Sequence, residues 1–508
     1  MKTVVLGGPL TPEEVVGVAR AGWPVSFAEA AERRVSHGRA FVDRLVAEDT
    51  LVYGITTGVG KLKDVHIPMA ERRALQLNLL RSHAAGLGPP MTGPETRAMW
   101  LCLAASLARG YSGVRPAVVR LVTDCLNRGV APVVPEWGSV GASGDLVPLA
   151  HAALVLVGEG EAWVDGRRLP GAAALAAVGL GPLVLEAKEG LALLNGTHQM
   201  AGIGALLLAD AAAALRLADV TGSMSLEALM GTNTAADARL HALRAHPGQV
   251  AAAANVRRLT AASEIIASHA DCHRVQDAYS LRCLPQVHGA TREAHAFARA
   301  ILTRELASVT DNPLVFPDDA QVLAGGNFHG QALALAFDTL AIGLGYLAGI
   351  AERRIDRLVN PLVSELPAFL APEAGLQSGY MLAQIQAAAL ASEVKTLAHP
   401  ASADSIPTSG DQEDFVPMGA GAVRKCREVL HRVRAVLAIE AVCAAQALDL
   451  RAPLRPGRGS AAAHAALRRR VPPLKQDRVV HEDLTAALAL VEDGSLLGAV
   501  EAAVGSLE

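Results

Sequence analysis

Long stretches rich in alanine and leucine constrain the fold of this chain more than any other feature. Alanine and leucine favour helices, and aromatic residues, which strands favour, make up only 3% of the sequence. No repeat of fixed length is present, so the pattern predicts a bundle of long helices and not a solenoid. The clearest of these stretches lie at residues 198–219, 250–279, 288–307, 329–358, 376–398 and 418–450.

The first part of the chain has a different pattern, with shorter segments separated by glycine. Thr11-Pro12-Glu13-Glu14 predicts a helix start, because it combines a capping threonine, a proline in the first turn and a glutamate at the capping-box position. We therefore divide the chain into a mixed N-terminal region, residues 1–190, and a long-helix bundle with a C-terminal helical cover, residues 191–508. Within the first region we expect helices at residues 27–48, 69–85 and 94–110, a loop at 51–63 and a hairpin at 159–169.

Composition excludes several classes of partner. The 508 residues carry a net charge of −4, from 46 basic and 50 acidic residues, which gives no broad basic field for nucleic acid. The amino terminus lacks the long apolar region of a signal peptide, and the six cysteines include no CxxC pair. Residues 332–350 are apolar, but Asp338 interrupts them, which favours a buried helix over a membrane span. We expect a cytoplasmic protein without nucleic-acid or membrane partners.

Three patterns suggest chemistry that the rest of the sequence does not support. His269 and His273 lie four residues apart near Cys272, but no third metal ligand follows at a diagnostic spacing, so we expect no metal. Gly58-Val59-Gly60-Lys61 lacks the serine or threonine that a phosphate loop places after its lysine. No GxSxG elbow surrounds Ser143, which argues against a serine hydrolase.

The segment Gly138-Ser139-Val140-Gly141-Ala142-Ser143-Gly144-Asp145-Leu146 is unusually rich in small residues. Its glycines admit backbone conformations closed to other residues. A serine hydroxyl can be lost as water, and an unhindered glycine amide can attack the carbonyl two residues earlier. On composition alone an ordinary connecting loop is the favoured interpretation.

Several further segments place polar groups in small or apolar surroundings, and together they resemble the aromatic amino acid ammonia-lyases. The similarity runs from Tyr53 to Met418 with the motifs in the family's order. It implies a mainly α, ammonia-lyase/fumarase-like fold of long near-antiparallel helices with a smaller mixed N-terminal region. It also implies a homotetramer whose active sites are shared between subunits. The motifs are Tyr53-Gly54-Ile55-Thr56-Thr57-Gly58-Val59-Gly60, the segment from Gly138 to Leu146, Asn195-Gly196-Thr197, residues 275–282, Gly326-Asn327-Phe328-His329-Gly330 and Gln412-Glu413-Asp414.

In this family an Ala-Ser-Gly tripeptide cyclises and loses water to give 4-methylideneimidazole-5-one (MIO). The resemblance places that electrophile at Ala142, Ser143 and Gly144, with no dissociable cofactor, and implies elimination of ammonia from an L-amino acid. A neutral tyrosine is a weak base, so a basic role needs surroundings that favour the phenolate. The implied roles are Tyr53 as the base, Tyr279 as its assistant, Arg282 on the substrate carboxylate, Asn195 and Gln276 as hydrogen-bonding groups, and Phe328 as packing against the prosthetic group.

The implied substrate depends on Ser82-His83 and Glu413, which resemble the histidine lyases of the family. Both side chains can hydrogen-bond an imidazole, and a phenyl ring would leave them unpaired. We therefore expect L-histidine to be converted to trans-urocanate and ammonia, the first step of histidine degradation. Phe415 and Pro417 depart from the usual histidine and serine, and Ala278 stands where proline is common. A lyase or aminomutase acting on phenylalanine or tyrosine, or an inactive helical scaffold, stays open.

Overall fold

The computed structural model describes residues 2–272 and 274–508, and the chain divides into two compact units. Each unit is assembled from three separate stretches of sequence. The division of the chain into domains at residue 190 stays a prediction. Unit 1 comprises residues 1–209, 298–338 and 400–424, and unit 2 comprises residues 210–297, 339–399 and 425–508.

Unit 1 contains short helices whose starts follow the sequence signals. Thr11 Oγ1 accepts a hydrogen bond from Glu14 N at 3.2 Å, and the Glu14 carboxylate accepts one from Thr11 N at 3.0 Å, which confirms the predicted capping box. The helices are α1 (Pro12–Ala21), α2 (Glu29–Ala47), α3 (Arg72–His83), α4 (Gly93–Leu107), α5 (Pro116–Asn127), α6 (Leu146–Leu156), α7 (Gly171–Ala177) and α8 (Glu189–Leu194).

Small sheets complete unit 1. The predicted hairpin is confirmed as β6 (Glu161–Val164) and β7 (Arg167–Pro170), and β4 (Ala131–Pro132) pairs with β6 to form three antiparallel strands. The other pairs are parallel β1 (Val4–Leu6) and β2 (Val25–Phe27), antiparallel β3 (Leu87–Pro90) and β5 (Pro135–Trp137), and antiparallel β8 (Leu314–Phe316) and β9 (Gln321–Leu323).

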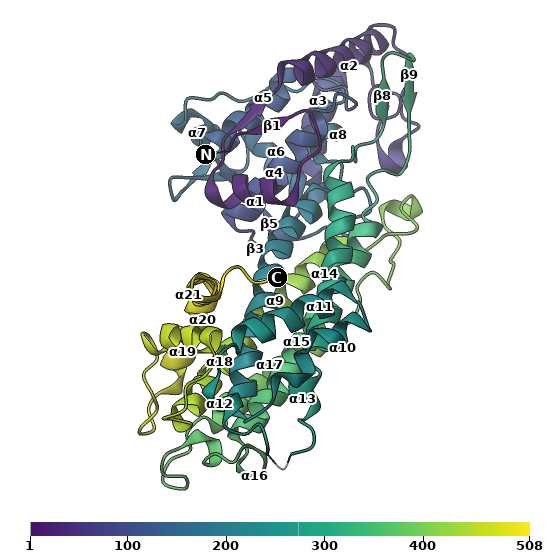
Figure 1. The fold of residues 1–508 in the computed structure, drawn as a ribbon. Coiled ribbons are helices and arrows are strands. Elements are labelled where there is room, and N and C mark those ends of the chain that lie inside the picture. Colours follow the sequence, from purple (N-terminus) through teal and green to yellow (C-terminus); the bar gives the residue numbers. More distant parts are fainter. Residues whose placement is uncertain (1, 273) are drawn as a thin grey trace. The chain divides into compact units, whose positions relative to one another are not determined.

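The packing of α3 against α6 and α8 brings three chain segments to one place. His83 is the last residue of α3, Asn195 directly follows α8, and the glycine-rich segment directly precedes α6. Figure 1 shows these helices together in the part of the chain coloured purple to blue. The fold thereby gathers residues that are far apart in sequence.

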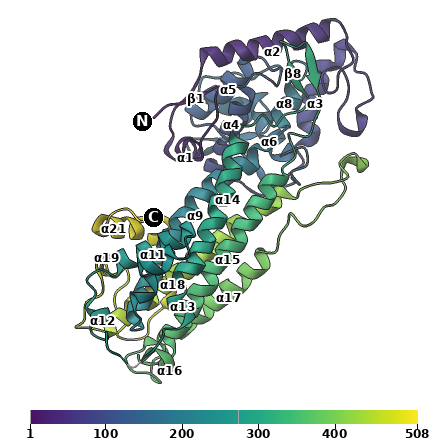
Figure 2. The same cartoon turned by 45° about the vertical axis from the view of Figure 1, so that its right-hand side comes forward.

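Unit 2 contains the long helices that the alanine and leucine pattern predicts, which confirms the mainly α fold. In Figures 1 and 2, α15 and α17 run side by side. A Cβ on Gly343 of α15 would lie 2.9 Å from Cβ of Ala294 in α14, so only a small residue permits this approach. The long helices, four of which also contribute residues to unit 1, are α9 (His198–Ala228), α14 (Leu284–Leu306), α15 (Gln331–Val359), α17 (Met381–Leu397) and α18 (Gly419–Leu450).

Shorter helices cover the bundle, and one predicted helix is wrong. The stretch at residues 250–279 is not continuous, because α11 ends at Leu259 and Ala262 has a φ of 63°. Backbone hydrogen bonds from Arg458 N to Ala261 O and from Glu264 N to Arg455 O turn the chain there. The shorter helices are α10 (Ala238–Ala242), α11 (Pro247–Leu259), α12 (Glu264–Ala267), α13 (Tyr279–Arg282), α16 (Pro361–Ser364), α19 (Arg458–Arg468), α20 (Val480–Glu492) and α21 (Ser495–Val504).

Helices α9 and α15 are long and apolar enough to cross a membrane by length and composition. Their most apolar windows are 72% and 67% buried inside the protein, as core helices are. The apolar stretch at residues 332–350 therefore lies in a largely buried helix.

Candidate active site

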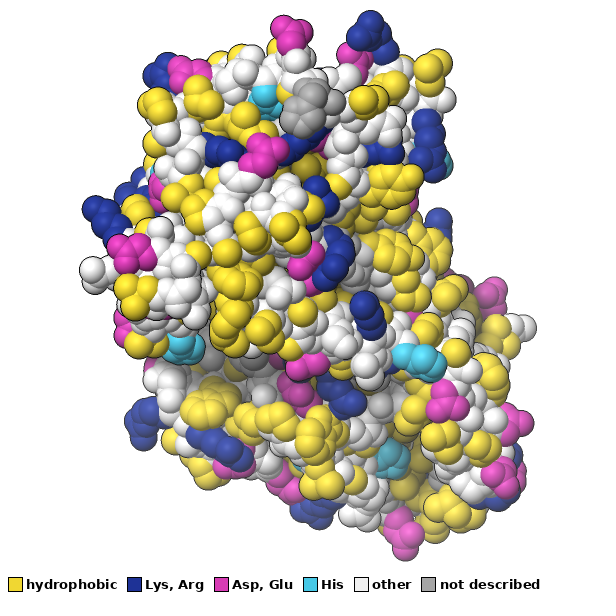
Figure 3. Space-filling model, turned by 90° about the horizontal axis from the view of Figure 1, so that it is seen from below, with side chains coloured by type: hydrophobic (Ala, Val, Ile, Leu, Met, Phe, Trp, Pro, Cys, Tyr) yellow, Lys and Arg dark blue, Asp and Glu magenta, His cyan; other side chains and the backbone are white. Residues whose placement is uncertain are grey.

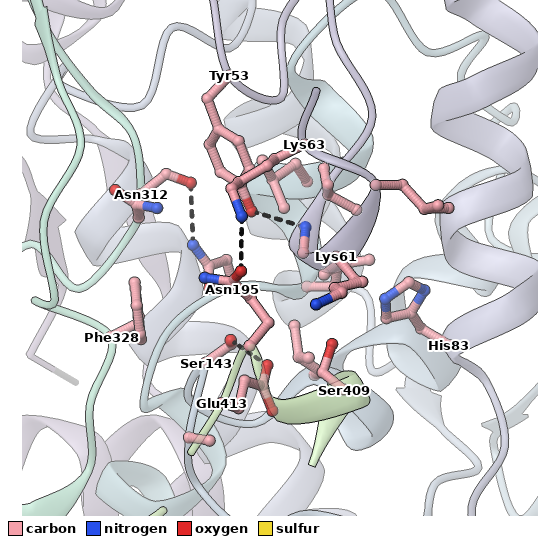
Figure 4. Close-up of a pocket in the computed structure, with 18 of the residues that line it drawn as sticks. Tyr53, Lys61, Lys63, His83, Ser143, Asn195, Asn312, Phe328, Ser409 and Glu413 are labelled. Carbon is pink, nitrogen blue, oxygen red and sulfur yellow. Dashed lines mark hydrogen bonds between the residues drawn. The ribbon is translucent and has the colours of Figure 1, made fainter. Parts of the chain in front are cut away.

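A cavity of about 1090 Å³ lies in unit 1 and is open to solvent at one side. Leucines of α3 and α8 form its apolar wall, and polar side chains from several separate segments face it (Figure 4). Seven of the residues to which the resemblance assigns a catalytic or binding role line it: Tyr53, His83, Ala142, Ser143, Asn195, Phe328 and Glu413.

The glycine-rich loop beside the cavity requires glycine at its end. Gly141 and Gly144 have φ values of 79° and 69°, and a backbone bridge between them closes a tight turn around Ala142 and Ser143. A Cβ on Gly144 would lie 2.1 Å from the carbonyl of Gly196, so no larger residue fits. The Gly196 amide donates to the Ser143 carbonyl oxygen at 3.2 Å. These contacts fix the loop against the segment that follows α8.

Asp145 ties the same loop to the start of α9. Its buried carboxylate accepts hydrogen bonds from the backbone amides of Gln199 at 2.9 Å and Met200 at 3.0 Å, and from Ser139 Oγ at 3.1 Å. Burial raises the pKa of Asp145 to about 7, although the Met200, Ser139 and Gln199 hydrogen bonds each act to lower it. Asp145 therefore joins the helix N-terminus to the loop.

Tyr53 lies in the loop predicted at residues 51–63. Its phenolic oxygen accepts a hydrogen bond from the backbone amide of Gly60 at 3.1 Å. Gly60 has a φ of 59°, and this turn directs its N–H back toward the ring. A donor directed at the phenolic oxygen stabilises negative charge there, which the basic role implied by the resemblance needs.

His83 presents a hydrogen-bond acceptor to the cavity. Its Nδ1 lies 2.8 Å from the carbonyl oxygen of Leu79, one turn earlier in α3. Because a carbonyl oxygen can only accept, Nδ1 carries the hydrogen, and Nε2 of the neutral ring is left as an acceptor. The ring is half-buried, so this acceptor is available to a ligand.

Glu413 is held in place by two hydroxyl groups. Its Oε1 accepts from Ser143 Oγ at 2.9 Å, and its Oε2 accepts from Thr408 Oγ1 at 2.6 Å. Figure 4 shows the Ser143–Glu413 hydrogen bond at the edge of the cavity. The segment that carries the expected specificity residue therefore contacts the Ala142-Ser143-Gly144 tripeptide directly.

The rings of Phe328, His329 and Phe415 line the cavity, and Figure 4 shows Phe328 on the side opposite His83. The Gly330 amide donates to the Gly141 carbonyl oxygen at 3.0 Å, which fixes this segment to the glycine-rich loop. Phe415, one of the departures from the family pattern, stacks on His329 with ring centroids 6.3 Å apart. Phe415, where a histidine is usual, therefore adds an apolar surface beside Glu413.

Sequence reasoning missed several lining residues. Lys61 and Lys63 reach the cavity from the Tyr53 loop, and Lys63 Nζ donates to Gln412 Oε1 at 2.7 Å. Lys61 stood in the rejected phosphate-loop pattern, which gave no reason to place it at this site. Asn312 also lines the cavity, and its only signal was the turn-forming pair Asn312-Pro313.

Gln276, Tyr279 and Arg282 are not among the residues that line this cavity, and all three belong to unit 2. Tyr279 is 70% exposed, and the Arg282 guanidinium lies over its ring at 4.7 Å. Gln276 lines a smaller hollow of about 220 Å³ within unit 2.

His269, which the sequence places in a metal-like cluster with Cys272 and His273, contacts the backbone instead. Both ring nitrogens of His269 lie near backbone carbonyl oxygens, Nδ1 at 2.6 Å from Ile265 and Nε2 at 3.2 Å from Gly231. His273 lies outside the described residues. Among residues 2–272 and 274–508, no group of three histidine, cysteine, aspartate or glutamate side chains is arranged to hold a metal ion.

Comparison with known proteins shows which family the chain belongs to. The sequence profile described as aromatic amino acid lyase matches residues 10–469. The chain belongs to the aromatic amino acid lyase family. The family predicted from the ordered motifs is therefore confirmed.

Relatives of this lyase match it along its whole length. Histidine ammonia-lyase of Sorangium cellulosum (strain So ce56) is 53% identical over 513 residues, with 99% of this chain and 100% of the relative covered. The crystal structure of histidine ammonia-lyase from Trypanosoma cruzi has a TM-score of 0.91 at 41% identity, covering 99% of this chain and 96% of that one. Tyrosine aminomutase from Streptomyces globisporus has a TM-score of 0.95 at 36% identity, covering 100% of both chains.

Proposed function

We propose that this lyase eliminates ammonia from L-histidine and releases trans-urocanate. The observation that supports this most directly is the pair of acceptors at the cavity, His83 Nε2 and the Glu413 carboxylate. An imidazole carries the N–H donor that such acceptors need. A phenyl ring carries none, so His83 Nε2 would be left unpaired at a cost of about 1–3 kcal/mol, while Glu413 would keep only its hydrogen bonds from Ser143 and Thr408. The full-length similarity to histidine ammonia-lyases points to the same substrate.

A three-substrate assay tests this proposal. We expect ammonia release from L-histidine to exceed that from L-phenylalanine and L-tyrosine in kcat/KM, with urocanate as the olefinic product. A preference for either rival amino acid would refute the histidine assignment. Because one structural neighbour is a tyrosine aminomutase, the products are also analysed for a β-amino acid, which would identify an aminomutase instead.

Replacing His83 tests the acceptor itself. We expect His83→Leu to lower kcat/KM for L-histidine by about 10- to 100-fold, the loss of one hydrogen bond to the substrate. The matched variant His83→Gln keeps an amide oxygen that can accept, and it retains most of the activity. Equal losses in the two variants would show that ring packing, and not the acceptor, explains the role of His83.

We further propose that Ala142, Ser143 and Gly144 form MIO, as the family does in general. The residues fit this modification, because Gly144 closes a tight turn on Gly141 and packs where no Cβ fits. Closure joins Gly144 N to the Ala142 carbonyl carbon with loss of one water, and loss of the Ser143 hydroxyl with its α-hydrogen releases a second. The bound group supplies an electrophile that ordinary side chains lack.

The roles of the chain's own side chains follow from their contacts. Tyr53 removes the β-proton at its phenolic oxygen, which the Gly60 amide stabilises when charged. His83 and Glu413 hold the imidazole, so that the proton to be removed faces the base. Phe328 packs at the cavity wall and restricts water.

We propose that the protein acts as a homotetramer in which unit 2 of one copy completes the cavity of another. The cavity of unit 1 is lined by no arginine among the described residues, whereas Arg282 and the 70% exposed Tyr279 lie on unit 2. Val275 beside them is 95% exposed. Figure 3 shows that hydrophobic side chains lie among charged ones on one face of the molecule. We propose a cytoplasmic location because all six cysteines are free.

A mixing experiment tests the shared site. We expect the Tyr53→Phe and Tyr279→Phe variants to be inactive as separate proteins. When the two are co-expressed, hybrid tetramers contain some sites in which both tyrosines are intact, and activity returns. If the co-expressed pair stays as inactive as either variant alone, both residues act within one chain and the shared site is wrong.

A further inference from the structure

Lys188 combines two unfavourable features that the proposed mechanism does not explain. Its φ is 76°, a left-handed conformation that is unfavourable in a residue with a side chain. Its side chain is also 0% exposed, although lysine is almost never fully buried without a partner. Both features persist only where contacts of the surrounding structure stabilise them.

The partner of Lys188 is Asp311, which is buried as well. Lys188 Nζ lies 2.7 Å from Asp311 Oδ2, and the two side chains are 0% and 1% exposed. The other carboxylate oxygen, Oδ1, accepts from Asn195 Nδ2 at 3.1 Å. The buried ion pair thus ends on a residue that lines the cavity.

These contacts fix which end of the Asn195 amide faces the cavity. Nδ2 donates to Asp311 Oδ1 and to the backbone carbonyl oxygen of Asn312, both at 3.1 Å. A flipped amide would place Oδ1 against two acceptors, which is unfavourable. Both amide hydrogens are therefore used, and Oδ1 is the polar atom of Asn195 left for a ligand.

We propose that the Lys188–Asp311 ion pair is a positioning device that makes Asn195 a dedicated acceptor for the α-amino group of the substrate. This inference rests on the proposed function. The carboxylate of the substrate and the carbonyl group of the MIO ring can only accept hydrogen bonds, so Asn195 Oδ1 cannot bond to either. The α-ammonium group is the donor that every amino acid substrate brings. Asn195 lies beside the reactive tripeptide because the Gly196 amide donates to the Ser143 carbonyl oxygen.

The test compares a substrate that has the amine with a product that lacks it. In the double variant Lys188→Met/Asp311→Asn both charges are removed, which avoids an unpaired buried charge. The amide introduced at position 311 can donate to Asn195 as well as accept from it, so the orientation of Asn195 is no longer fixed. We expect KM for L-histidine to rise about 10-fold or more, the scale of a hydrogen bond to a charged group. Inhibition by urocanate, which has no α-amino group, should be unchanged.

A matched control separates positioning from general disturbance of α8. Arg115→Met/Glu189→Gln removes the neighbouring ion pair, whose carboxylate is also 0% exposed, without touching Asp311 or Asn195. We expect this control to leave both KM and urocanate inhibition unchanged. Thermal unfolding and intact mass verify that each variant folds and is modified as the wild type is.

The outcomes are decisive in each case. An unchanged KM in the Lys188/Asp311 double variant, or equal weakening of L-histidine and urocanate binding, overturns the inference. If the double variant does not fold, Asn195→Ala must give the same amine-specific effect, and equal losses for both ligands refute it. If the wild type prefers another amino acid, the histidine proposal fails separately, and the same comparison is made with that amino acid and its olefinic product.

Discussion

Replacing Ser143 by alanine abolishes ammonia release, with kcat lowered by at least about 10³-fold, the scale of removing a group that takes up charge in the transition state. Alanine has no hydroxyl to lose, so the electrophile cannot form. The fold should persist, because Ser143 is only half-buried and its side chain makes one hydrogen bond, to Glu413. We expect a stability change of about 1 kcal/mol. Steady-state assays and thermal unfolding of the same preparation measure both effects.

A matched replacement identifies the cause of the lost activity. Thr408→Val removes the other hydroxyl that donates to Glu413, at 2.6 Å, but leaves Ser143 intact. It should keep the prosthetic group and a substantial part of the activity. A Ser143→Ala variant that retains wild-type turnover would contradict the proposed mechanism.

The Tyr53→Phe variant should bind substrate but turn it over about 10²- to 10⁴-fold more slowly, the usual contribution of a positioned general base. Only the phenolic oxygen is removed, and with it the acceptor of the Gly60 amide hydrogen bond. The cavity keeps its shape, so inhibition by urocanate should be nearly unchanged. Exchange of the substrate β-hydrogen with deuterated water, followed by mass spectrometry, should fall in parallel with kcat.

Tyr111→Phe provides the control for that variant. Tyr111 lies in unit 1 but does not line the cavity, and its ring contacts Phe316 at a centroid distance of 5.5 Å. Loss of its hydroxyl should leave kcat unchanged. If Tyr53→Phe is equally active, the base lies elsewhere and the role assigned to Tyr53 is wrong.

Much of the fold was predictable from local signals. The Thr11 capping box, the hairpin at residues 159–169 and the long alanine-rich helices all depend on residues close in sequence, and all are observed. The predicted continuous helix at residues 250–279 was wrong because a contact between distant parts of the chain interrupts it. The turn after Leu259 depends on hydrogen bonds to the chain around Arg458, about 200 positions later, which no local pattern reveals.

The site was predictable only where residues share a recognisable motif. Tyr53, Ser143 and Glu413 are far apart in sequence, and their ordered motifs, not their composition, indicated that they belong together. Lys188 and Asp311 carried no such signal, because a buried ion pair depends on where two distant segments pack. The orientation of the Asn195 amide likewise depends on Asp311 and is visible only in three dimensions.

The mass of the wild-type chain tests the central claim, that this lyase builds its own electrophile, most directly. Mass spectrometry of the peptide that spans Ala142, Ser143 and Gly144 is compared with the same peptide from the Ser143→Ala variant. We predict that the wild-type peptide is lighter than its sequence by one water for ring closure and one for the lost hydroxyl. A wild-type peptide at its full sequence mass, in a preparation that releases ammonia from L-histidine, would contradict the account.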